Sequence, residues 1–167
     1  MTAMSFPFGT VTKPLITDPS TQTAVRFLGA LVRMRASSSD TDGAWALLEH
    51  EGERGYMSPL HLHEADEETF LVLDGELRVE VGHERLSVGS GGLALLPRGI
   101  PHGFVVTSPQ ARFLTLHTPG GFDRFVAEAG IALDAPDAAD APPLDPAELT
   151  RIAAAHGIQI VGPPLEP

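Results

Sequence analysis

Apolar and polar residues alternate in many short runs between residues 44 and 117. Alternation with a period of two is typical of β-strands that bury one face. Turns rich in Gly, Asp, Ser and Pro separate the runs, and this density of short antiparallel strands predicts a sandwich or a barrel. The predicted strands cover residues 44–51, 56–63, 68–73, 76–82, 85–88, 93–96, 102–107 and 111–117.

The segment before these strands, residues 24–36 (AVRFLGALVRMRA), is ambiguous, because its periodicity fits a strand or an amphipathic helix. Gly29 and the β-branched Val25 and Val32 favour a strand. We therefore expect the β-structure to begin near residue 24.

The period changes after residue 121. Phe122, Phe125, Val126 and Ala129 fall on one face of a helix, and Gly130 suits its end. The spacing therefore predicts a short helix directly after the last strand of the barrel.

A second helix is predicted near the C-terminus, over residues 145–155. Asp145 suits the N-cap and Pro146 the first helical position. Before it, residues 131–143 are rich in Ala, Asp and Pro and read as a loop, whereas residues 158–161 after it suit a short strand.

Length, charge and cysteine content narrow the class of protein. A chain of 167 residues has the usual length of a single domain and is long enough to enclose a ligand cavity. The absence of Cys excludes disulfides and thiolate metal sites, and the net charge of -11 disfavours nucleic acid and anionic membranes as partners. No signal peptide or run of about 18 apolar residues is visible, so we expect a soluble cytoplasmic protein.

Four side chains stand out as candidates for demanding chemistry. His61 and His63 lie two apart in a predicted strand, so both imidazoles project from one face. Glu68 opens the next strand, and His102 follows a Pro- and Gly-rich turn. Imidazoles combined with a carboxylate suit one divalent first-row transition metal (Fe, Mn, Co, Ni, Cu or Zn) and not Ca²⁺ or Mg²⁺.

The spacing of these residues resembles the two sequence motifs of the cupin superfamily. The first runs from Gly55 to Gly75 as G-x5-H-x-H-x4-E-x6-G, and the second from Gly91 to His102 as G-x5-P-x-G-x2-H. The second motif usually closes with Asn, where this chain has Val106. Further stretches resemble the single-domain, quercetinase-like cupins of bacteria, and together they extend the resemblance over about residues 25–165. These stretches are residues 63–73, 97–104, 118–125 and 157–164.

The resemblance implies an all-β fold, a double-stranded β-helix or jelly-roll barrel, with one or two short C-terminal helices. The expected organisation is an N-terminal arm over residues 1–22 and a single cupin domain over residues 23–167, in which the barrel covers about 24–118 and the helical segment about 121–165. Cupins of this type commonly pair, so the resemblance also implies a homodimer.

The resemblance further implies that His61, His63, Glu68 and His102 are the metal ligands. Glu67 stands at a shorter spacing that the family permits, but only Glu68 is separated from the first motif's final Gly by six residues. In the flavonol dioxygenases of the family the matching Glu also accepts the substrate's hydroxyl proton, which would make Glu68 the catalytic base.

The expected activity is that of an oxygen-dependent oxidoreductase acting on a small aromatic or enolic compound. A cupin isomerase, decarboxylase or cyclase of a tailoring pathway is an alternative, and so is a non-catalytic cupin that binds a metal and a small molecule. Alternation along the strands predicts an apolar substrate-binding wall. Its expected members are Met57, Phe70, Val72, Phe104 and Phe113.

The remaining histidines match neither motif. His83 lies in a predicted turn and His156 at a helix end, which favours structural or surface roles. His50 and His117 are flanked by strand residues, and the sequence leaves open whether they are structural or line the barrel mouth.

Overall fold

The computed structural model describes residue 11, residues 13–136, residue 138 and residues 141–167. Half of the predicted N-terminal arm therefore lies outside the described residues, since residues 1–10 and 12 are not among them. The described part of the arm contains no helix or strand.

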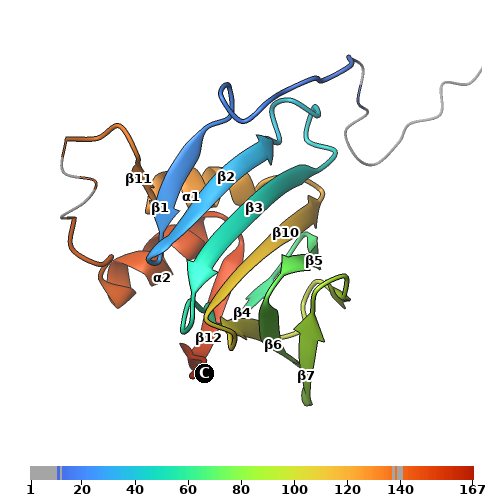
Figure 1. The fold of residues 1–167 in the computed structure, drawn as a ribbon, viewed down its shortest axis with the longest axis vertical. Helices are drawn as coiled ribbons and strands as arrows, with labels where there is room; N and C mark the ends of the chain where they lie inside the picture. The colour runs from blue at the N-terminus through green and yellow to red at the C-terminus, as the bar shows by residue number, and fades with distance from the viewer. Residues whose placement is uncertain (1–10, 12, 137, 139–140) are drawn as a thin grey trace, which may run out of the picture.

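The chain folds into two antiparallel sheets, and the predicted jelly-roll barrel with two short helices is confirmed (Figure 1). The seven-stranded sheet has the order β11 (Ile131–Ala132), β1 (Ala24–Phe27), β2 (Ala30–Ala36), β3 (Ala46–Glu53), β10 (Gln110–Thr118), β5 (Glu67–Asp74) and β8 (Leu93–Leu96). The five-stranded sheet has the order β12 (Ile158–Pro164), β4 (Pro59–His63), β9 (His102–Val106), β6 (Glu76–Val81) and β7 (Glu84–Gly89). The helices are α1 (Phe122–Ala129) and α2 (Pro146–Ala155).

Two predicted boundaries are wrong for identifiable reasons. Residues 24–36 form a hairpin of β1 and β2 instead of one strand, because Leu28 and Gly29 turn the chain with φ angles of 50° and 86°. The predicted loop 131–143 contains the short strand β11, whose Ile131 pairs with Arg26 on β1. Local composition did not reveal this pairing, because it joins segments about one hundred residues apart.

Both helices begin and end as the sequence predicts. The Asp145 side chain accepts hydrogen bonds from the backbone N–H groups of Ala147 and Glu148, at 2.9 and 3.2 Å, and so caps α2. At the end of α1 the backbone N–H of Gly130 donates to the carbonyl of Val126. These local interactions set where each helix starts and stops.

The helices fill the space between the first strands and the edge strand β12. Helix α1 contacts β1 and β3, and α2 contacts β12, as Figure 1 shows. Their apolar faces join one hydrophobic cluster, in which the rings of Phe27 and Phe125 meet edge to face at 5.6 Å. A second cluster, built around Phe70, Leu77 and Phe113, fills the other half of the barrel. The candidate site lies where these two clusters meet.

Candidate metal centre

The four predicted ligands converge in the barrel interior. His61 and His63 project from the same face of β4, and His102 on β9 is the direct cross-strand partner of His61. Glu68 reaches the same point from β5 in the other sheet. All four side chains are buried, and their ligating atoms lie within 4.8 Å of one another. We call these four residues the HHEH cluster.

Short distances connect the atoms that face the centre of the HHEH cluster. The Nε2 atoms of His61 and His63 lie 3.2 Å apart. Glu68 Oε2 lies 3.1 Å from His102 Nε2 and 3.5 Å from His63 Nε2. The donor set is therefore three imidazole nitrogens and one carboxylate oxygen, which suits a divalent transition metal.

The outward-facing nitrogens show that the cluster fits a cation. His61 Nδ1 donates to the carbonyl of Pro59 at 2.8 Å, and His102 Nδ1 donates to the carbonyl of Ile100 at 2.9 Å. Because a carbonyl oxygen only accepts, each neutral ring carries its proton on Nδ1 and turns a lone pair on Nε2 towards the centre. Lone pairs gathered at one buried point are what a metal ion requires.

Electrostatics keep His61 neutral and Glu68 ionised. Burial, together with the neighbouring His102, lowers the pKa of His61 to about 3. Burial by itself raises the pKa of the Glu68 carboxyl, but attraction to His117 and the close contacts with His102 and His63 outweigh it, so its pKa lies well below the usual range. Neutral imidazoles and an ionised carboxylate are the ligating forms of these side chains.

Asp66 and His117 support the HHEH cluster and were not predicted to take part in it. One Asp66 oxygen lies 3.0 Å from His63 Nδ1 and 3.0 Å from His117 Nδ1. Burial by itself raises the pKa of Asp66, but these hydrogen bonds outweigh it and lower the pKa to about 2. His117 is the cross-strand partner of Glu68, and its Nε2 lies 3.5 Å from Glu68 Oε1. Asp66 thus orients His63, as an outer carboxylate commonly does for a ligating imidazole.

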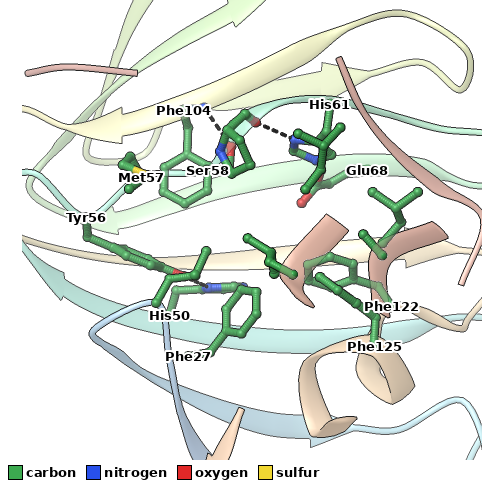
Figure 2. A pocket seen from close by; sticks show the side chains of 16 residues that line it. Phe27, His50, Tyr56, Met57, Ser58, His61, Glu68, Phe104, Phe122 and Phe125 are labelled. Carbon is green, nitrogen blue, oxygen red and sulfur yellow. Dashed lines mark hydrogen bonds between the residues drawn. The ribbon is translucent and has the colours of Figure 1, made fainter. Parts of the chain in front are cut away.

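A small cavity, here called the inner pocket, opens beside the HHEH cluster and has a volume of about 40 Å³. Figure 2 shows His61 and Glu68 on one side of it, with Tyr56, His50 and Phe27 across from them. Phe122 and Phe125 bring aromatic rings from α1 to its wall. The inner pocket is therefore largely apolar around a polar end.

The structure brings only part of the predicted substrate-binding wall to the inner pocket. Met57 and Phe104 line the inner pocket. Phe70, Val72 and Phe113 do not line it, because they pack against one another and their neighbours in the second hydrophobic cluster. Alternation correctly turned these three side chains inward, but this half of the barrel is filled by side chains and leaves no space for a ligand.

His50 and Tyr56 form a buried polar pair in the wall of the inner pocket. His50 Nδ1 lies 2.9 Å from the Tyr56 hydroxyl, and His50 Nε2 lies 3.0 Å from Thr115 Oγ1. Burial lowers the pKa of His50 to about 3 and raises the pKa of Tyr56, so both side chains are neutral. The sequence left the place of His50 open and did not single out Tyr56. Their pairing depends on how β3 faces the segment before β4.

Replacing Tyr56 by Phe is expected to lower the free energy of unfolding by about 1–3 kcal/mol, because it removes a hydrogen-bond partner from the buried His50 ring. Urea unfolding measures the change. In a double-mutant cycle with His50→Phe, the losses of unfolding free energy in the two single variants should sum to more than the loss in the double variant. Equal stability of Tyr56→Phe and the original chain would show that this bond contributes nothing.

Comparisons with known proteins agree with the fold and the HHEH cluster. Residues 49–117 match the cupin domain family. Over 85 residues the chain is 32% identical to quercetin 2,3-dioxygenase of Bacillus subtilis (strain 168), a match that covers 51% of this chain and 25% of the relative. The chain therefore spans only a quarter of the length of that curated relative.

Solved structures also resemble this chain, and these matches cover a larger part of their own length. The polyketide cyclase RemF from Streptomyces resistomycificus is 28% identical, with a TM-score of 0.53 over 64% of this chain and 80% of the cyclase. An RmlC-like cupin from Shewanella frigidimarina NCIMB 400 shares the fold at 15% identity, with a TM-score of 0.59 over 67% of this chain and 96% of that protein.

In the part of the chain that the structure describes, neither helix is long and apolar enough to cross a membrane. The two jelly-roll sheets, the buried HHEH cluster at the motif positions and the match over residues 49–117 lead to one assignment. The chain therefore contains a cupin domain, matched over residues 49–117, in a jelly-roll fold that a solved cupin structure shares.

Proposed function

We propose that this cupin is a metal-dependent enzyme that oxidises a small hydroxylated aromatic or enolic compound with dioxygen. One observation carries the proposal: two members of the HHEH cluster, His61 and Glu68, form the polar end of a pocket whose other lining residues are mostly aromatic and aliphatic. A substrate ring whose hydroxyl edge enters the inner pocket would therefore present its oxygen to the ligands. Similarity to quercetin 2,3-dioxygenase over 85 residues supports the same class of substrate.

The HHEH cluster would hold one divalent transition metal ion, and Fe, Mn, Co, Ni, Cu and Zn all accept this donor set. The ion would supply Lewis acidity, which lowers the pKa of a substrate hydroxyl. Asp66 and the carbonyls of Pro59 and Ile100 fix the orientation of the imidazoles from outside. The orientation of the three imidazoles in this chain thus depends on neighbouring groups that accept hydrogen bonds from their outer nitrogens.

The residues of the inner pocket have separate tasks in this proposal. Glu68, held ionised by its neighbours, accepts the hydroxyl proton of the substrate. Phe104 and Phe122 contact the faces and edges of the substrate ring and exclude water. Exclusion of water strengthens the electrostatic interactions of Glu68 with the substrate oxygen.

Oxygen consumption is the direct test. The purified chain is analysed for its metal content, stripped of metal, and reloaded with each candidate ion. It is then incubated with flavonols, catechols and diketones in an oxygen-electrode cell. We expect oxygen uptake in proportion to substrate loss with at least one ion, and none with the metal-free chain. An absence of uptake with every ion and every compound would contradict the proposal.

A non-oxidative reaction is the second candidate, and the 28% identity with a polyketide cyclase favours it. The same pocket can bind an enol, and Glu68 can remove a proton from carbon as well as from oxygen. The two candidates differ in their need for oxygen. Turnover of a polyketide-like enol at equal rates with and without air would favour the cyclase reaction.

A further inference from the structure

A second and larger cavity, here called the outer chamber, lies next to the inner pocket. Its walls come from the β1–β2 turn, the end of α1, the segment before α2, α2 itself and β12. Five residues line both spaces, so the two lie side by side. The shared residues are Leu28, Met57, Pro59, Leu149 and Ile160.

The volumes show that the inner pocket alone does not hold a whole aromatic ligand. It measures about 40 Å³, and since a water molecule needs roughly 10–15 Å³ on this scale, it accommodates only a few waters or part of one ring. The outer chamber measures about 590 Å³, which is within the range of roughly 300–1,000 Å³ typical of small-molecule sites. Most of the mass of a bound ligand must therefore lie in the outer chamber.

The chemistry of the outer chamber matches an apolar ligand body. Ala129 and Ile131 line one side, and Pro143 and Leu144 line another. Among the described residues of its wall, Arg26 is the one with a formal charge. A guanidinium can stack on an aromatic face or approach a phenolate, so it is compatible with a hydroxylated ring system.

We infer that the outer chamber binds the distal rings of a multi-ring hydroxyaromatic substrate, whose hydroxyl-bearing ring enters the inner pocket towards Glu68. This inference rests on the proposed function for the direction in which the substrate lies. It adds that the chain selects its substrates by size, in a chamber built by the C-terminal helices and the β1–β2 turn. Single-ring compounds use only part of the site and bind weakly.

Thr150 offers a way to fill the chamber without touching the HHEH cluster. It lies exposed on α2 and lines only the outer chamber. Ala154, one turn further along the same helix, is also exposed and lines neither space. Thr150→Trp therefore narrows the chamber, and Ala154→Trp is the matched control.

The probes are catechol, 2,3-dihydroxynaphthalene and alizarin. Each carries two adjacent hydroxyls on one ring, and the three molecules have one, two and three fused rings, respectively. Their dissociation constants are measured by calorimetry on the metal-free and the zinc-loaded chain, so no turnover is needed. We expect alizarin to bind at least about tenfold more tightly than catechol to the original chain, because added rings bury apolar surface. Thr150→Trp should weaken alizarin binding at least about fivefold and leave catechol binding within about twofold.

Ala154→Trp should match the original chain with all three probes. Melting curves confirm that each variant is folded, and Thr150→Phe provides a second, smaller obstruction. Affinity that does not rise with ring number, or an equal effect of Thr150→Trp on catechol and alizarin, overturns the inference. Oxygen uptake tests the proposed reaction separately, so failure of the chemistry and failure of the chamber give different results.

Discussion

Replacement of His102 by Ala is expected to abolish tight metal binding. His102 Nε2 is buried, faces the centre of the HHEH cluster and has no substitute within it. Loss of an outer group that only orients a ligand typically lowers metal affinity about 10–100-fold, so loss of a ligand should exceed about 100-fold. Elemental analysis after dialysis would then find metal in the original chain and little in the variant.

Thermal unfolding gives an independent measure of the same prediction. A metal at about 100 times its dissociation constant stabilises the folded chain by about 2.7 kcal/mol, and this should raise the melting temperature of the original chain only. His83→Ala is the matched control, because His83 is exposed in the turn before β7. The metal affinity of Asp66→Asn should lie between the affinities of His83→Ala and His102→Ala, about tenfold below that of the original chain. Full metal occupancy in His102→Ala would show that the ion binds elsewhere.

The convergence of the HHEH cluster could be predicted from strand geometry together with the motif spacing. A strand places residues two apart on one face, which fixes His61 and His63 relative to each other. The positions of Glu68 and His102 followed from the motif spacing, and the register His61–His102 in the structure explains why that spacing works. The strands themselves were predictable from alternation, apart from their ends.

The supporting residues could not be predicted from the sequence because they depend on register between distant strands. His117 meets Glu68 only because β10 pairs with β5, and Tyr56 meets His50 only because the chain folds back towards β3. Nothing in the local composition around these residues marks them. Asp66 was visible as one of several acidic residues in its loop, but its bond to His63 was not.

The predicted substrate wall lies only partly beside the inner pocket, for a different reason. Alternation tells which side chains face inward, but it does not tell which inward-facing residues fill the barrel and which border a cavity. Phe70 and Phe113 fill it, at 1% and 0% exposure. The aromatic residues that replace them in the pocket wall, Phe27 and Phe122, come from the first strand and from α1. The helices therefore contribute to the site, although the sequence indicated only that they follow the barrel.

Replacement of Glu68 by Gln is expected to lower kcat by about 100- to 10,000-fold, the range associated with loss of a general base. Gln keeps the shape of the side chain but removes the charge and the ability to accept the substrate's proton. Three imidazoles remain in the variant, so it should still take up metal at high metal concentration, although its affinity should fall about 100-fold or more, as expected for loss of a ligand. At saturating metal, alizarin should bind to the zinc-loaded variant within a few fold of the original chain.

Glu67→Gln separates this effect from a general loss of negative charge near the centre. Glu67 is the adjacent residue on β5, but its carboxylate points away from the cluster and pairs with Arg98 at 2.6 and 2.7 Å on the surface. The variant should lose that partly exposed ion pair, worth roughly 0–1 kcal/mol of stability, and keep both metal and turnover. If Glu68→Gln turned over substrate at the rate of Glu67→Gln while both held metal, proton removal by Glu68 would be wrong. The carboxylate would then serve only to hold the ion.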